Sequence, residues 1–428
     1  MRRRVLKLLL AVTALALAVS LPVFAAGGTI TYWSPFGGDS LKWDQWRIGE
    51  FQKANPDVTV DLVATPSGGI TNGKLLAAIA GGDAPDIVLS DNASATYSFA
   101  ANGTAVPWDM SKISLKIQDM LPGMKEITQI DGQTYILPAD TNVIMLYMNK
   151  KIFQEAGLDV NKPPRTLAEL DELANKLDKY SGSTIDRFGF IPWLDYPSDN
   201  AFYWPWMFGA TIYDTRTKTL NLTDEKMVHV YTWMNMYAQK RSPTAMKSFT
   251  SGFGALFSPD HPFMTGKVAM TVVGNWFTNA LRIYAPTIQY AVAKVPVPPG
   301  GRAGATVFQS NVWMIPKGAK NADLVYRFVN FCETTKVLSN DFDIWRSIPT
   351  NDKQFDEVSW TKKGDPIYRI ERQLANSPES GHPALTRVAA ELQNDLNALR
   401  DDVIYNNKDP RPLLKALQDK FTQELMQN

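Results

Sequence analysis

Three β-rich segments decide the fold of this chain: Thr29-Ile30-Thr31-Tyr32-Trp33, Val58-Thr59-Val60-Asp61-Leu62-Val63 and Asp86-Ile87-Val88-Leu89. In the first segment polar and apolar residues alternate, and β-forming residues are frequent. The third segment is an apolar run typical of a buried strand. Helix-forming stretches over residues 40–54 and 73–80 separate them. Because strand, helix, strand, helix and strand follow one another closely, the pattern predicts parallel βαβ units and an α/β fold.

The rest of the chain continues this mixture of strands and helices. Thr166 is expected to cap a helix that starts at Leu167, with Glu169 as its partner in a capping box. The other expected elements are strands over 143–148, 268–273 and 290–297 and helices over 167–177, 322–336 and 385–405. The last helix is expected to form one apolar face from Leu385, Val388, Leu392, Leu396 and Leu399.

The composition is that of a globular protein and excludes several classes. The chain has 428 residues, of which 45% are hydrophobic and 20% charged, and this length suggests two or three domains. Its 44 basic and 43 acidic residues nearly balance, which argues against a nucleic-acid-binding protein. The single cysteine, Cys332, lies in an apolar helical pattern and is expected to be a buried structural thiol. The three histidines match no zinc spacing, so we expect no metal.

The first 25 residues have the parts of a secretory signal peptide. A basic start, Arg2-Arg3-Arg4 with Lys7, precedes an apolar run from Leu8 to Val19. Val23 and Ala25 then occupy the −3 and −1 positions of a cleavage site. A membrane anchor is the alternative, but the run is shorter than the roughly 20 residues that span a bilayer. We therefore expect cleavage near Ala25, a periplasmic location and no membrane insertion afterwards.

Four motifs follow one another along the chain. The first runs from Lys74 to Val88 as a helix, two glycines, Pro-Asp and a strand. The others run from Tyr135 to Leu158, from Phe263 to Trp276 and from Trp313 to Asn321. In order and spacing they resemble the family 1 extracellular solute-binding proteins of ABC import systems, the group that contains maltose- and other sugar-binding proteins. The similarity extends over about residues 28–425.

The resemblance implies an architecture and a function. The architecture is the two-lobed α/β fold of periplasmic binding proteins, with hinge strands and a ligand cleft between the lobes. Lobe one would comprise residues 26–139 and 297–348, and lobe two residues 140–296 and 349–428. The protein would be a monomeric, non-enzymatic substrate-binding component without a cofactor. It would capture a saccharide, expected to be an oligosaccharide, and deliver it to the transmembrane subunits of an ABC permease.

The ends of the first and third strands supply candidate ligand residues. Ligands of parallel α/β sheets bind outside the carboxyl ends of the strands, which places Trp33, Phe36 and Asp91 near the cleft. Sugar rings stack their apolar faces on flat aromatic side chains, and their hydroxyls need polar partners once water is expelled. For Trp33, packing beneath the first loop is the alternative.

The second lobe and the segments between lobes add further candidates. Trp276 occupies a position where the family commonly carries a ligand-stacking tryptophan, and a core tryptophan is the alternative. Tyr203-Trp204-Pro205-Trp206 suits neither a surface loop nor a regular helix interior, so at least one of Tyr203, Trp204 and Trp206 is expected to line the cleft. The remaining candidates, with turns, caps or filled space as alternatives, are Asp140, Asn142, Asp199, Asn275, Gln309 and Ser310.

Four other residues are expected to have no ligand role. Trp43 and Trp46 are expected in the core or at the rim of the first helix. Arg346 is expected to be a solvated surface arginine, with a place near the rim of lobe one as the alternative. The resemblance puts His382 in a loop near the lip of the cleft, where it is expected to be an exposed loop histidine.

Two other functions remain open. A glycerol-phosphate receptor would share the fold, but phosphate calls for Arg, Lys or backbone donors, and the candidate residues are mainly acidic or neutral. A secreted carbohydrate-active enzyme would need two opposed carboxylates, and abundance alone is no argument for such a pair. The sequence contains no Gly-x-Gly-x-x-Gly fingerprint, Walker loop or Gly-x-Ser-x-Gly elbow. ATP hydrolysis is therefore expected on a separate subunit.

Overall fold

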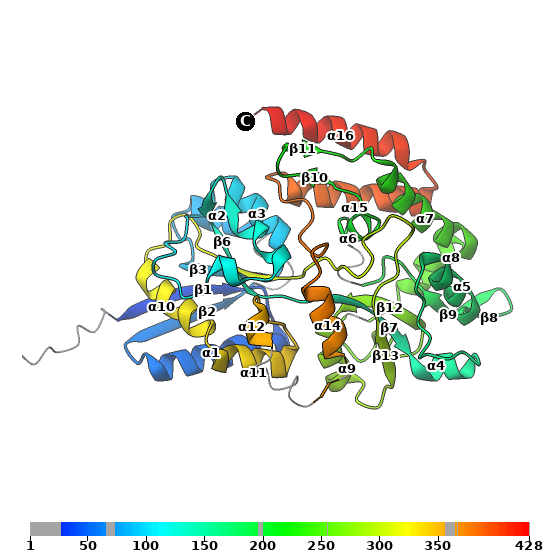
Figure 1. Ribbon diagram of the computed structural model, residues 1–428, viewed down its shortest axis with the longest axis horizontal. Coiled ribbons are helices and arrows are strands. Elements are labelled where there is room, and N and C mark those ends of the chain that lie inside the picture. The colour runs from blue at the N-terminus through cyan, green and yellow to red at the C-terminus, as the bar shows by residue number, and fades with distance from the viewer. Residues whose placement is uncertain are drawn as a thin grey trace, which may run out of the picture.

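The computed structural model describes residues 27–65, 73–195, 200–254, 256–355, 364–365 and 367–427. Two five-stranded sheets stand side by side, each with its own helices, and the chain forms two lobes (Figure 1). This confirms the two-lobed α/β fold. The predicted signal peptide, residues 1–25, and the candidate Asp199 lie outside the described ranges. Within those ranges, no helix combines the length and apolar character needed to cross a bilayer.

The first sheet contains the three strands predicted near the N-terminus. The middle strand β1 runs parallel to β2 on one side and to β3 on the other, which confirms the βαβ prediction. A later strand, β14, joins β3 in the antiparallel direction, and β6 pairs antiparallel with β14, so β6 runs in the same direction as the first three strands. In sheet order the strands are β2 (Val58–Ala64), β1 (Gly28–Ser34), β3 (Ile87–Ser90), β14 (Asn311–Met314) and β6 (Ile136–Asp140).

Helices cover this sheet because the sheet's side chains are apolar on both faces. Ile30 and Tyr32 of β1 are fully buried in a cluster with Phe51 of α1 and Phe328 of α10. Cys332, at the end of α10, is also buried, as predicted. The helices are α1 (Leu41–Ala54), α2 (Lys74–Ala80), α3 (Ala93–Ala101), α10 (Ala322–Cys332) and α11 (Thr335–Trp345).

The second sheet is built from the middle of the chain. Its central strand β12 is buried along its whole length, antiparallel to β7 and parallel to β9. In sheet order the strands are β13 (Tyr290–Ala293), β7 (Ile144–Asn149), β12 (Val268–Gly274), β9 (Thr184–Phe190) and β8 (Lys179–Ser181). The helices around it include α4 (Lys150–Glu155), α5 (Leu167–Leu177), α6 (Tyr203–Met207), α7 (Glu225–Arg241), α8 (Pro243–Thr250) and α9 (Phe277–Tyr284).

Of the two hydrogen bonds predicted for the capping box of α5, the one to the Thr166 side chain is confirmed. The Glu169 backbone N–H donates to Thr166 Oγ1 at 3.2 Å, so Thr166 caps the helix. The Glu169 carboxylate does not return to the Thr166 N–H. It accepts from the backbone N–H of Arg165, one residue earlier, at 2.6 Å.

Three predicted boundaries were wrong. The strand expected to end at residue 297 ends at Ala293, and the helix expected over 322–336 is two helices, α10 and α11. The last predicted helix begins at Ala389 rather than at residue 385, as α15 (Ala389–Asn406). Ala384 has a φ of 57°, a left-handed conformation that a helix does not contain. Leu385 therefore packs with the first sheet, away from the Leu392 face of α15.

Segments that connect the two lobes form a hydrogen-bonded ladder. Thr141 and Ile348 exchange two backbone bonds of 3.0 and 2.8 Å, and Asn142 and Gln309 exchange two more of 3.0 and 3.1 Å. The Phe308 N–H then donates to the Gly381 carbonyl at 3.0 Å. Four distant stretches of chain therefore meet between the sheets, where a hinge is expected.

The C-terminal helices pack across the top of the molecule in Figure 1. The helix α15 contacts α7 beside the second sheet and α3 beside the first, and α16 (Pro410–Met426) packs on α15. A shorter helix, α14 (Tyr368–Ala375), lies below, between the sheets. The lobe boundaries given above, 26–139 with 297–348 and 140–296 with 349–428, stay a prediction.

Candidate ligand-binding site

A cleft of about 650 Å³ opens between the two lobes, a volume in the range of small-molecule sites. Its base, called the floor, consists of four buried polar residues: Asn142, Gln309, Asn311 and Ser347. Its outer wall, called the mouth, consists of six large apolar or aromatic residues: Phe36, Leu256, Phe257, Ile283, Tyr284 and Trp345. The side walls add Trp43, Trp276 and Asp91.

Trp276 lines the cleft as predicted from the sequence. It follows β12 and directly precedes α9, so the end of a buried strand carries it to the cleft. Its indole Nε1 donates to Gln309 Oε1 at 3.1 Å, and its ring lies 5.2 Å from the ring of Phe257 at an angle of 37°. The side chain is half-buried, so part of its apolar ring remains accessible to a ligand in the cleft.

The floor carries an acceptor without a partner. Asn142 is 5% exposed, and its Nδ2 donates to the Gln309 carbonyl at 3.3 Å. Among the residues that the structure describes, no group donates to Asn142 Oδ1. A buried polar atom left unpaired costs free energy, so this oxygen is a natural partner for a ligand hydroxyl.

Asp91 joins the cleft to a smaller cavity. It follows β3 and is exposed to the cleft solvent, yet the surrounding walls remove enough water to raise its pKa above the usual value. The smaller cavity, of about 30 Å³, shares Asp91 and Gln309 with the main cleft. Tyr203 lines it too, with a buried hydroxyl that has no hydrogen-bond partner in the described part of the chain.

His382 closes the smaller cavity and is buried, so the prediction of an exposed loop histidine was wrong. Its Nδ1 lies 3.2 Å from the Gly123 carbonyl and its Nε2 3.0 Å from Ser310 Oγ. Because a carbonyl only accepts, Nδ1 carries the proton, and Nε2 is an acceptor that competes with Thr141 Oγ1, also at 3.0 Å, for the single Ser310 hydroxyl proton. Burial lowers the pKa of His382 to about 4, so the ring is neutral at pH 7. Ser310 faces this network rather than the main cleft.

Two predicted tryptophans belong to the core. Trp33 is buried with Leu75 of α2 and Val88 of β3, so it has a packing role, although its partners are these two elements and not the first loop that was expected to cover it. Trp204 is fully buried, its Nε1 donates to the Pro192 carbonyl at 2.6 Å, and its ring lies 4.8 Å from that of Trp233. Neither side chain lines the cleft.

Trp206 lies at a different opening, of about 220 Å³. The Arg302 guanidinium covers its ring at 4.0 Å, and its Nε1 donates to the Glu379 carbonyl at 3.1 Å. Of the cluster from Tyr203 to Trp206, Tyr203 therefore lines the smaller cavity beside the cleft. Trp204 belongs to the core, and Trp206 lies at the other opening.

Asp140 and Asn275 lie behind the cleft walls. Asp140 is 1% exposed and accepts from Asn311 Nδ2 at 2.8 and 2.9 Å, so it orients a floor residue. Burial raises the pKa of Asp140 to about 7 against the opposing effect of the Asn311 bonds. Asn275 is fully buried, and its Nδ2 donates to the Arg346 carbonyl at 2.7 Å and to Glu371 Oε1 at 3.2 Å. Both residues support the site without lining it.

Arg346 is buried, so the prediction of a solvated surface arginine was wrong. Its Nε and Nη2 donate to the two carboxylate oxygens of Glu371 at 2.5 and 2.9 Å, and its Nη1 donates to Asp365 at 2.5 Å. With Asn275, these groups tie α14 to the end of β12 next to the hinge ladder.

Sequence reasoning missed several aromatic residues of the cleft. Trp43 was expected in the core or at the rim, and it indeed packs on the buried Arg47 guanidinium at 3.9 Å, but its edge also lines the cleft. Phe257, Tyr284 and Trp345 carried no motif. These side chains reach the cleft because of how the two lobes meet, so no local sequence pattern predicts that they line it.

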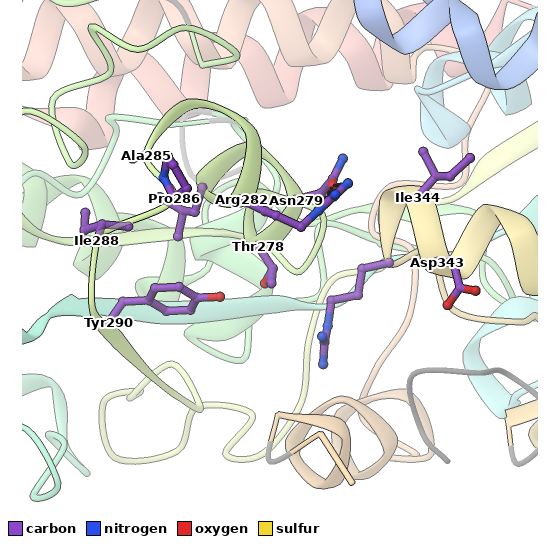
Figure 2. A pocket seen from close by; sticks show the side chains of 11 residues that line it. Thr278, Asn279, Arg282, Ala285, Pro286, Ile288, Tyr290, Asp343 and Ile344 are labelled. Carbon is purple, nitrogen blue, oxygen red and sulfur yellow. Dashed lines mark hydrogen bonds between the residues drawn. The ribbon is translucent and has the colours of Figure 1, made fainter. Parts of the chain in front are cut away.

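A further cavity lies on the other side of α9, and Figure 2 shows Tyr290 and Asp343 on opposite sides of this cavity. Its volume is about 360 Å³, and Arg282 and Thr278 also line it. It has a single aromatic ring and several charged groups. Stacking on a sugar needs flat apolar faces, so the interlobe cleft is the better candidate. Within the described residues, no cluster of His, Cys, Asp and Glu is arranged to hold a metal ion.

Comparisons with known proteins agree with the architecture. A solved structure of CpMnBP1 with mannotriose bound is 26% identical to this chain, with a TM-score of 0.82, and the match covers 91% of this chain and 99% of that chain. A maltooligosaccharide ABC transporter solute-binding lipoprotein of Streptococcus pneumoniae is 27% identical over 234 residues, 53% of this chain and 51% of that protein.

Another relative has a different kind of ligand in its name. The sn-glycerol-3-phosphate-binding periplasmic protein UgpB of Brucella abortus is 26% identical over 221 residues, 50% of this chain and 49% of that protein. The chain thus spans about half the length of these curated relatives. Residues 38–337, well over half of the chain, match the family model described as bacterial extracellular solute-binding protein. The four sequence motifs and this match agree, and the chain belongs to the bacterial extracellular solute-binding protein family.

Proposed function

We propose that this protein is the substrate-binding component of an ABC importer and captures a short oligosaccharide in the interlobe cleft. One observation carries the proposal: aromatic rings and an unpaired buried polar atom of the floor border the same cavity. Trp276 supplies an apolar face and Trp43 the edge of its ring, while Asn142 Oδ1 in the floor lacks a partner among the described residues. A pyranose ring presents that combination, an apolar face bordered by hydroxyls.

The second candidate ligand, a glycerol phosphate, fits the cleft less well. In the described part of the chain, neither the main cleft nor the smaller cavity is lined by a lysine or an arginine. The charged residues that do line the main cleft are Asp39 and Asp91. A phosphate would meet carboxylates there without a compensating cation, which favours a neutral saccharide.

The remaining features follow from this role. The protein would work in the periplasm after cleavage of residues 1–25, as a monomer without catalysis of its own. Ligand binding would favour the closed arrangement of the lobes, because groups from both lobes line the cleft. The closed form would then be presented to the transmembrane subunits of the permease. The relatives named for mannotriose and maltooligosaccharides support a saccharide of two or more units.

Titration calorimetry of the purified protein with mannotriose, maltotriose and glycerol 3-phosphate tests the proposal. We expect at least one oligosaccharide to bind with a micromolar dissociation constant, about −8 kcal/mol. Binding of glycerol 3-phosphate alone would favour the second candidate. If none of the three binds, and a wider saccharide panel gives no thermal shift, the proposed function fails.

A further inference from the structure

The cleft is divided into a polar part and an apolar part at different depths. The floor residues are buried, whereas Phe257 and Ile283 of the mouth are 40% and 42% exposed. Six large hydrophobic side chains are exposed in the described part of the chain, and these two are the pair that shares one cavity. Exposed apolar groups that gather at a cavity mark a surface that is covered in function.

The mouth offers few free polar groups, although the buried indole Nε1 of Trp345 has no partner among the described residues. The Tyr284 hydroxyl lies 3.5 Å from Asp39 Oδ2, and the other oxygen of Asp39 accepts from Lys42 Nζ at 2.7 Å. Leu256 and Ile283 are aliphatic and provide no flat face for a sugar ring. A pyranose lodged against them would bring hydroxyls out of water without partners, which costs free energy.

The mouth also closes across the two lobes. Phe257 lies on the side of the second sheet and its ring stands 6.0 Å from that of Trp345, at the end of α11, at an angle of 87°. The same Phe257 ring contacts Trp276, which borders the floor. A group held by the mouth would therefore be continuous with a ligand seated on the floor.

On these grounds we propose that the saccharide carries an apolar substituent, an aryl or short acyl group, which the mouth binds while the floor binds the sugar hydroxyls. This inference rests on the proposed function, because it assigns the ligand class of the same cleft. Burial of the substituent removes both its own apolar surface and that of Phe257 and Ile283 from water. It would act as a bridge between the lobes and favour their closed arrangement.

Matched glycosides test the inference. The probes are the methyl and p-nitrophenyl glycosides of mannotriose and of maltotriose, titrated calorimetrically into the purified protein. We expect the p-nitrophenyl form of the bound sugar to bind about tenfold more tightly than the methyl form, a difference of about 1.4 kcal/mol. The double variant Phe257→Ser/Ile283→Ser is expected to lose this preference and still bind the methyl glycoside.

A matched control is available because other exposed apolar residues line neither the main cleft nor the smaller cavity. The variant Leu76→Ser/Met236→Ser changes two such residues, on α2 and α7, and should keep the preference. Equal affinities for the two glycosides in the parent protein would overturn the inference and leave the proposed function standing. A preference that survives in Phe257→Ser/Ile283→Ser would overturn it as well. Failure of every glycoside and free sugar to bind would refute the proposed function itself.

Discussion

The indole Nε1 of Trp276 donates a hydrogen bond to Oε1 of Gln309 at 3.1 Å. Trp276 follows the central strand of the second sheet, whereas Gln309 belongs to the ladder between the lobes, where it exchanges two backbone bonds with Asn142. The bond therefore holds a cleft-lining ring in a fixed orientation relative to the hinge. A ring positioned in this way can stack on a sugar without losing further side-chain freedom.

The acceptor on Gln309 can be removed at nearly constant size. We expect Gln309→Met to weaken oligosaccharide binding about three- to tenfold, because the Trp276 N–H loses its partner and the ring is less well held. Gln309→Glu keeps an acceptor at the same place and should bind nearly as well as the parent protein. Titration calorimetry measures both, and an equal loss in the two variants would contradict a role for the acceptor.

Removal of the ring itself should have a larger effect. We expect Trp276→Ala to weaken binding roughly 10- to 200-fold, by analogy with the about 1–3 kcal/mol contributed by a base stacked on an aromatic side chain. Trp46→Ala is a suitable control, because Trp46 is half-buried on α1 and lines none of the cavities of the cleft. Unchanged affinity in Trp276→Ala would exclude this ring from the ligand site.

The fold was predictable because its signals are local. The alternation in β1, the apolar run of β3 and the helices between them are each readable within a few residues, and parallel pairing follows from their order. The start of α15 was not readable, because it depends on the left-handed conformation of Ala384, a residue type that ordinarily continues a helix.

The site was predictable only in part because the direction of a side chain depends on distant packing. Trp276 and Asn142 were found, but Trp204 was not distinguishable from a ligand residue until its contact with Trp233 was known. The buried His382 ring is hydrogen-bonded to the carbonyl of Gly123, which lies more than 250 positions earlier in the chain. Trp345 lines the cleft only because the lobes meet at α11. No local pattern contains these relations.

Variants of Asp140 can show whether this residue positions Asn311 from behind or contacts the ligand itself. Its pKa is raised to about 7 from 3.8, so the folded protein resists its ionisation, and its contribution to stability is lost as pH rises from 3.8 through 7. Asp140→Asn keeps an oxygen for the Asn311 amide and has no charge to bury. We expect urea unfolding to show a gain in stability at pH 8 and little gain at pH 4.

The same variant also reports on binding. Because Asp140 lies behind Asn311, Asp140→Asn is expected to leave oligosaccharide affinity at pH 7 within about threefold of the parent. A much larger loss, without loss of stability, would return Asp140 to the ligand site.

The ion pair between Arg346 and Glu371 is expected to dominate the stability of the region near the hinge. Arg346→Ala leaves the fully buried Glu371 without its bidentate partner, which typically costs about 3–5 kcal/mol. Lys336→Ala breaks the exposed pair with Glu50 and should cost less than about 1 kcal/mol. Urea unfolding of the two variants measures the difference, and similar costs would contradict the buried geometry of Arg346.

Acidic pH should lower the stability of the fold through protonation of the buried His382 ring. Its pKa is lowered by burial from 6.5 to about 4, so the neutral ring contributes stability above pH 6.5 that is lost as pH falls toward 4. The full contribution is about 3 kcal/mol, since one pKa unit corresponds to about 1.4 kcal/mol. His382→Gln has no such titration, although it retains groups able to pair with Gly123 and Ser310. Urea unfolding of the parent and the variant at pH 7, 5.5 and 4.5 should therefore show the stability of the parent falling faster. Parallel pH profiles would mean that His382 is hydrated and that the cavity between Asp91 and Tyr203 stands open to water in solution.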